Sequence, residues 1–169
     1  MKKQTGFTLL ELVVVIAITS ILTTVVTVNF QQQKSSQEVN AAAVDFISKI
    51  REVQNNILAG KTMSGQIKPA TAYQIVLTTN SNSYRIDYDM GGTINTLETV
   101  TLSANIRVNQ VYIDGSPVGN TTLRIASPYG EIRADGVTNK VVKVDLINTA
   151  TSAVRAVIID GISGRIGLQ

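Results

Sequence analysis

Glu11 is the residue of this chain whose type and position most strongly indicate chemistry. It is the only formally charged residue between Phe7 and Phe30, a stretch otherwise built of apolar and uncharged polar side chains. A carboxylate at membrane depth costs about 2.5–3.5 kcal/mol, so a residue of this kind indicates a function. We expect a cation to neutralise it, because an unpaired buried charge is strongly penalised. The alternative is a tolerated glutamate near a helix end that reaches toward lipid headgroups.

The stretch from Phe7 to Phe30 is long enough to cross a bilayer, because a transmembrane helix needs about 20 predominantly apolar residues. Lys2 and Lys3 precede it and should remain in the cytoplasm, which sends the rest of the chain outward. The sequence therefore predicts a single-pass protein of the cytoplasmic membrane, with its head in the periplasm or at the cell surface. Hydroxyl groups in the stretch can bond to helix carbonyls, and they belong to Thr8, Thr19, Ser20, Thr23, Thr24 and Thr27.

The order of features at the N-terminus differs from that of a secretory signal. Such a signal has an apolar core followed by a cleavage site of small residues. Here Gly6 lies before the apolar run, directly after a short basic leader. A cut after Gly6 would remove residues 1–6 and leave the helix attached to the mature chain.

The string GFTLLE at residues 6–11 resembles the class III leader of the type IV pilin and type II secretion pseudopilin superfamily. The resemblance implies that prepilin peptidase cleaves between Gly6 and Phe7, that Phe7 is N-methylated, and that the subunit assembles into a helical filament. It also implies that Glu11 pairs with the new amino group of Phe7 on another subunit. The expected partners are prepilin peptidase, other pilin or pseudopilin subunits, the filament assembly platform and, before assembly, membrane lipid.

The composition argues against an enzyme. The chain has no histidine and no cysteine, which excludes Ser-His-Asp and Cys-His catalysis, histidine metal sites and disulfides. The glycines at positions 161, 164 and 167 do not precede a helix and lack the Lys-Ser/Thr of a phosphate loop. We therefore expect no catalytic residue and no cofactor.

Asp87 and Asp89 are a carboxylate pair with a spacing that chemistry could use. At positions i and i+2 they share one face of a strand, as paired catalytic carboxylates would. With Gly91 and Gly92 they could also supply oxygen ligands to calcium, which some pseudopilins bind. The spacing matches no recognisable calcium loop, so we predict no metal site and favour a cluster of surface charge.

Residues 31–59 continue the helix with a different pattern. Apolar residues recur there at spacings of three and four, which places them on one face: Val39, Ala43, Phe46, Ile50, Val53 and Ile57. We expect this stripe to pack under a sheet, with a coiled-coil segment as the alternative, and Gly60 to end the helix. Ser20 and Val28 stand where many superfamily members carry a helix-breaking glycine and proline, so the usual weak points are missing.

Residues 61–169 change to a β pattern. A linker with Gly65 and Pro69 is followed by short runs rich in β-branched residues, separated by turn residues. Several runs alternate apolar and polar residues, as half-buried antiparallel strands do. The predicted strands are Tyr73–Thr78, Tyr84–Tyr88, Thr99–Leu102, Ile106–Ile113, Thr122–Ala126, Val141–Asn148 and Val154–Ile159.

The fold class is therefore α+β, with a long N-terminal helix, half transmembrane and half amphipathic, packed on an antiparallel β-sheet domain. This is the pilin-like fold that the leader implies. The expected divisions are a cleaved leader at 1–6, a transmembrane and filament-core helix at 7–30, its amphipathic half at 31–60, and a β-rich head at 61–169.

Two segments of the head repeat one pattern, at residues 123–133 and 157–166. Each predicts a β-hairpin closed by a glycine-containing turn. In the second, Gly164-Arg165-Ile166 resembles the ending of H-type minor pseudopilins and related minor pilins. That resemblance implies a minor structural subunit of a type II secretion pseudopilus or a type IV pilus.

The alternative is a minor pilin whose head binds DNA or a secreted substrate. Some related minor pilins bind DNA near a C-terminal Gly-Arg-x-Arg motif, in which Gly167 here replaces the second arginine. The candidate contacts are Arg165 and Arg155, and further basic side chains are Arg133, Lys140 and Lys143. Their scatter over separate strands favours an ordinary solvated face. The net charge of +3 falls to +1 once the two leader lysines are removed, so nucleic acid is not an expected partner.

Overall fold

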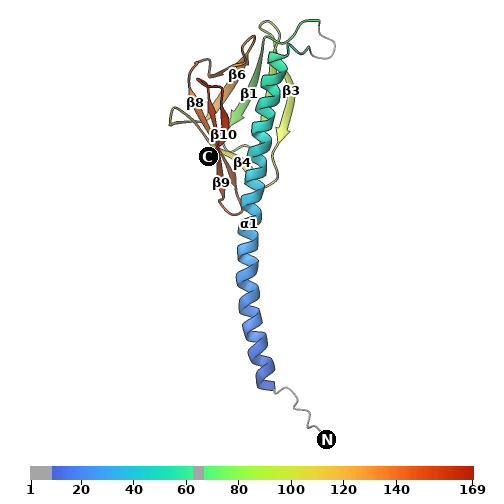
Figure 1. The fold of residues 1–169 in the computed structure, drawn as a ribbon, viewed down its shortest axis with the longest axis vertical. Helices are drawn as coiled ribbons and strands as arrows, with labels where there is room; N and C mark the ends of the chain where they lie inside the picture. Colours follow the sequence, from blue (N-terminus) through green and yellow to red (C-terminus); the bar gives the residue numbers. More distant parts are fainter. Residues whose placement is uncertain (1–8, 63–66) are drawn as a thin grey trace. The chain divides into compact units, whose positions relative to one another are not determined.

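The computed structural model describes residues 9–62 and 67–169, and the side chains of these residues outside 25–29. The chain divides into two compact units, Met1–Lys34 and Ser35–Gln169. Helix α1, Leu9–Leu58, contributes to both (Figure 1). Its backbone is helical through Ser20 and Val28, which agrees with the absence of glycine and proline at these positions.

Helix α1 ends in a Schellman motif at Gly60. The backbone N–H of Lys61 donates to the carbonyl of Asn56 at 3.0 Å, and that of Gly60 donates to Ile57 at 3.2 Å. Gly60 has a φ of 58°, a left-handed conformation that glycine adopts without strain. The predicted stop is confirmed.

The described residues of the second unit form ten strands in two antiparallel sheets. In the first sheet the strand order is β3-β2-β1-β6-β7, and in the second it is β10-β9-β8-β4-β5. The strands are β1 Ala72–Thr78, β2 Ser83–Asp89, β3 Ile94–Thr101, β4 Ile106–Ile113, β5 Ser116–Val118, β6 Asn120–Ala126, β7 Glu131–Ala134, β8 Val141–Asn148, β9 Val154–Asp160 and β10 Ile166–Leu168. The α+β class and the antiparallel pairing are confirmed.

The apolar stripe of the helix forms one wall of the core of this unit. All six predicted stripe residues are buried, from Val39 at 0% to Ile57 at 4% exposure. They join one cluster with the inward side chains of both sheets, and Phe46 packs edge-to-face on Tyr84 with ring centroids 5.0 Å apart. Near the helix end, the guanidinium of Arg51 donates to the carbonyl of Ile166 at 3.0 Å.

The two predicted hairpins are confirmed and account for two short strands. Strand β7 pairs with β6, and β10 pairs with β9. Strand β5 is not among the predicted strands. The turn occupies Asp114 and Gly115, both with positive φ, and Pro117 lies on an edge strand, where its missing N–H breaks no ladder.

The prediction for β3 was wrong at its start. Residues 99–102 were expected, whereas the strand begins at Ile94. Most of its side chains are exposed, so its first half shows no alternation of burial that the sequence could have displayed. The two sheets are joined where Asn80 N–H donates to the Val108 carbonyl at 2.6 Å and Val108 N–H donates to Ser81 at 2.8 Å.

Candidate functional site

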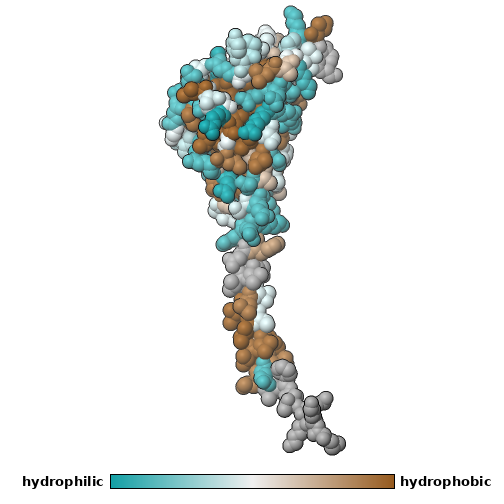
Figure 2. Space-filling view, viewed as in Figure 1, coloured by the Kyte–Doolittle hydropathy of each residue, from teal (hydrophilic) through white to brown (hydrophobic). Residues whose placement is uncertain are grey.

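The helical part of the first unit exposes its apolar side chains. Between Leu9 and Leu22 the large apolar residues are 48% to 81% exposed, and the space-filling view shows this part of the helix largely in brown (Figure 2). Glu11 lies in the first described turn and is exposed among them. Apolar surface of this kind marks a site of contact with membrane or protein.

Hydroxyl groups on this helix bond to its own backbone, as predicted. Ser20 Oγ donates to the carbonyl of Ile16 at 2.7 Å, and Thr23 Oγ1 donates to Thr19 at 2.7 Å. Thr19 and Thr24 make the same type of bond. These bonds satisfy the polar groups within the helix, so the hydroxyls do not prevent an apolar environment around it.

Two predicted site residues, Gly6 and Phe7, lie outside the described residues. Within the described part of the chain, we find no helix with the length and apolar character that a membrane span requires. The predicted crossing at 7–30 and the role of Glu11 in assembly therefore stay predictions.

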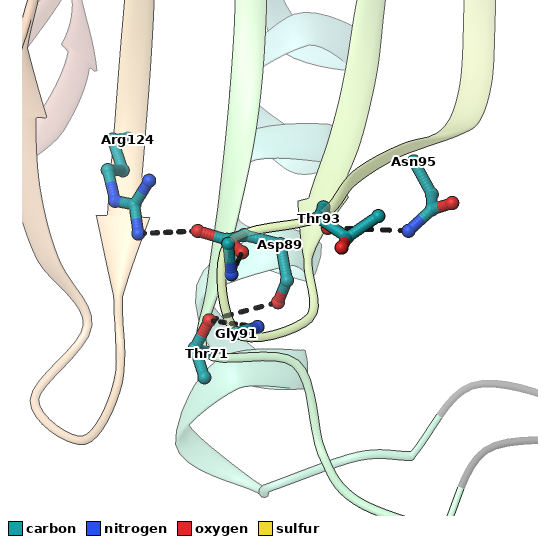
Figure 3. Close-up of polar contacts among 7 residues, drawn as sticks. Thr71, Asp89, Gly91, Thr93, Asn95 and Arg124 are labelled. Atoms are coloured by element: carbon teal, nitrogen blue, oxygen red, sulfur yellow. Dashed lines mark hydrogen bonds and ion pairs between the residues drawn. The ribbon is translucent and has the colours of Figure 1, made fainter.

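In the second unit, Asp89 lies at the centre of a polar cluster that joins strands β2 and β6 to the β2–β3 turn and to the residue before β1 (Figure 3). Its Oδ2 accepts a hydrogen bond from Arg124 at 2.8 Å, and its Oδ1 accepts one from the Gly92 N–H at 2.7 Å. Its backbone carbonyl accepts bonds from the N–H and the hydroxyl of Thr71. The hydrogen bond from the Gly92 N–H is the largest cause that lowers the pKa of the Asp89 carboxyl, and the Arg124 guanidinium lowers this pKa further.

Asp87 belongs to a different contact. Both aspartates are buried, so the expectation of a cluster of surface charge was wrong. The Arg85 Nε lies 2.8 Å and 3.0 Å from its two carboxylate oxygens. Each aspartate is therefore held by its own arginine, an arrangement suited to fixing the sheet rather than to proton transfer. Among the described residues there is no cluster of three or more metal-ligating side chains.

No pattern in the sequence indicated that Arg124 would be the partner of Asp89. Strand β1 lies between β6 and β2, and in its register Arg124 pairs with Gln74 whereas Asp89 pairs with the small Ala72. Arg124 therefore reaches Asp89 diagonally across β1. Only the order and register of the strands bring these two charges together.

Residues 1–27 match the family model described as the prokaryotic N-terminal methylation motif. The chain carries a prepilin-type leader. This match supports membership of the type IV pilin and type II secretion pseudopilin superfamily, and it leaves the subtype open. Neither a curated protein nor a solved structure matches the chain.

The prepilin-type leader has consequences for how the exposed helix is interpreted. It indicates a structural subunit rather than an enzyme. It implies anchoring in a membrane, processing by prepilin peptidase and assembly with other pilin subunits. A subunit that contacts first a membrane and then other subunits needs an exposed apolar surface, and the helix between Leu9 and Leu22 has one.

The basic residues considered for DNA in this prepilin-type chain lie on separate strands and loops. Arg155 is exposed on β9, and Arg165 is exposed in the β9–β10 turn, where its charge helps Ser163 to lower the pKa of Asp160. Three others contact carboxylates: Arg133 with Glu131 at 2.8 Å, Lys140 with Asp114 at 2.6 Å, and Lys143 with Asp145 at 3.2 Å. Pairing lowers the positive potential that phosphate contacts need.

Proposed function

We propose that this chain is a minor, H-type subunit of a type II secretion pseudopilus or a type IV pilus. Prepilin peptidase cleaves it between Gly6 and Phe7, and Phe7 is then N-methylated. The observation that carries the proposal is the methylation motif at residues 1–27, a range that includes the exposed apolar part of the helix between Leu9 and Leu22. The Gly164-Arg165 turn between β9 and β10 supports the H-type assignment.

In this proposal Glu11 contacts the amino group of Phe7 on a neighbouring subunit. Helices 7–30 of several subunits would surround the pair with apolar side chains, and low polarity strengthens a charge-assisted hydrogen bond. A subunit whose Glu11 lacks that cation would carry an uncompensated charge, which disfavours incorrect docking. This contact forms in the filament, whatever contacts Glu11 makes within its own chain.

Before assembly, lipid covers the apolar helix. We place the subunit in the cytoplasmic membrane, crossing it once between residues 7 and 30, with residues 35–169 outside the cytoplasm. The leader lysines on the inner side support this orientation. The filament assembly platform then transfers the helix from lipid to the filament, where other subunits replace lipid as the apolar surroundings.

The alternative is a head that captures DNA or a secreted substrate. Arg155 and Arg165 are exposed, but Arg133, Lys140 and Lys143 contact carboxylates. A DNA-binding face needs several uncompensated cations and loses affinity steeply with salt. The structural role therefore has more support.

The test is to separate processing from incorporation. We expect Glu11→Gln to be processed normally, so that mass spectrometry finds a mature chain starting at methylated Phe7. Its amount in sheared filaments should fall at least about tenfold, because a loss of 1.4 kcal/mol already changes an equilibrium by a factor of ten. Gly6→Val should retain Met1 at its N-terminus and stay in the membrane fraction.

Two matched variants control this test. Glu52→Gln removes a carboxylate from the exposed face of the helix in the head, where Glu52 contacts Lys49 at 3.0 Å, and incorporation should remain normal. Gly119→Val changes a glycine with open space around it, and processing should remain normal. Normal incorporation of Glu11→Gln would refute the pairing, and cleavage of Gly6→Val between residues 6 and 7 would refute the processing site.

A further inference from the structure

Strand β3 forms the edge of the first sheet and differs from the other sheet edges. It has eight residues, whereas the other three edges that the structure describes, β7, β10 and β5, have four, three and three. Strand β5 also carries Pro117, which blocks strand addition. Only β3 therefore offers a long row of unpaired backbone groups among the described strands.

The hydrogen bonds show which residues of β3 face outward. The N–H of Leu102 donates to the carbonyl of Asn82 at 2.8 Å, so residue 102 faces β2. The direction of the backbone N–H and C=O groups alternates from residue to residue along an antiparallel strand. Those of Val100 therefore also point to β2, and those of Thr99 and Thr101 point away from the sheet. A bulge at Leu97, between the pairs Glu98–Ile86 and Thr96–Asp87, separates this regular half from the first half of the strand.

The side chains of β3 do not protect this edge. Ile94 and Leu97 are 55% and 41% exposed. The only charged residue on the strand, Glu98, is bonded back to Lys49 of α1 at 2.8 Å. The edge lacks the unpaired lysines and the proline that keep many natural edge strands apart.

We propose that β3 pairs with β3 of a second copy of this chain in an antiparallel, two-fold contact centred on Val100. Thr99 of one copy then faces Thr101 of the other, and both residues have outward backbone groups, so each pair exchanges two hydrogen bonds. Facing threonines are a favourable cross-strand pair. Two copies of the strand can pair without repulsion between like charges, because the one carboxylate on each strand is held by Lys49 of its own chain.

This contact is a closed dimer, since a two-fold interface uses the same patch on both copies. It requires neither cleavage at Gly6 nor a filament, so it can fail or succeed independently of the proposed function. The paired segment is short and buries less area than a stable soluble dimer needs. We therefore expect a weak dimer that covalent trapping reveals.

The test uses the absence of cysteine from the chain. Single variants Thr99→Cys and Thr101→Cys of the full chain, in detergent micelles, are mixed and mildly oxidised. We expect the mixed 99–101 disulfide to form at least about fivefold more than either homodimer, because only the mixed pair stands directly opposite. Thr151→Cys, in the exposed turn after β8, gives the rate of random collision.

A proline pair checks that trapping depends on the backbone. Thr99→Pro removes an outward N–H and keeps the β2–β3 ladder, so the fold is retained and trapping through Val100→Cys should fall to the collision rate. The same substitution at Thr151 should leave trapping through Val100→Cys unchanged. Three outcomes would each overturn the proposal. The 99–101 disulfide could form no more than the Thr151→Cys control, it could form no more than the 99–99 and 101–101 homodimers, or trapping through Val100→Cys could survive Thr99→Pro.

Discussion

The two parts of helix α1 use apolar residues in opposite ways. In the first unit apolar side chains occur at consecutive positions, such as Leu12 to Ile16, and are exposed all round. In the second unit they form a stripe, from Val39 to Ile57, and are buried. A sheet can cover only one face of a helix, so a stripe suffices within one chain. A helix that is apolar all round needs lipid or several neighbouring helices.

This difference predicts where stability resides. The largest effect is expected for Phe46→Ala, which leaves a cavity against Tyr84 and should lower the free energy of unfolding of the head by about 3–5 kcal/mol. The matched variant Ile16→Ala, in the exposed part of the helix, should change it by less than about 0.5 kcal/mol. Tyrosine fluorescence during denaturation in detergent measures both. Equal losses would mean that the two parts of the helix are not independent.

The second effect concerns the charged cluster around Asp89 in the head. Arg124→Ala leaves the buried Asp89 carboxylate with its Gly92 N–H bond but without its cation. We expect a loss of about 2 kcal/mol, below the value for a fully buried pair because Arg124 is partly exposed. Arg107→Ala, at an exposed position of β4, is the control. A loss no larger than the control would show that Asp89 does not rely on Arg124.

The smallest effect is a pH dependence. The pKa of Asp89 is lowered from its ordinary value of 3.8 in the folded chain, so its contribution is present above that value and is lost as the pH falls below it. Stability of the head should therefore decline in acid, and Asp89→Asn should decline less steeply over the same range. Denaturant titrations at several pH values between 5 and 2 measure the slopes. Parallel slopes would exclude Asp89 as a source of acid sensitivity.

The sequence predicted those elements whose burial alternates along the strand. Ile106–Ile113 and Val141–Asn148 were predicted with their observed bounds, because both carry a buried face in the middle of a sheet. The start of β3 and the whole of β5 were missed, since edge strands have few buried neighbours and little pattern to display. For the candidate site, the leader and Glu11 could be found from residue type and spacing alone. Their roles in processing and assembly stay predictions.

By itself, the sequence determined the local properties of this protein: a prepilin-type leader, a helix whose apolar pattern changes from all round to a stripe, a glycine at its end, and hairpins closed by turn residues. These follow from interactions between residues close together in the chain. The tertiary structure alone decided that two five-stranded sheets form, that Arg124 reaches Asp89 diagonally across β1, and that β3 is left as the long free edge. Strand order and register depend on contacts between distant residues, which no local pattern records.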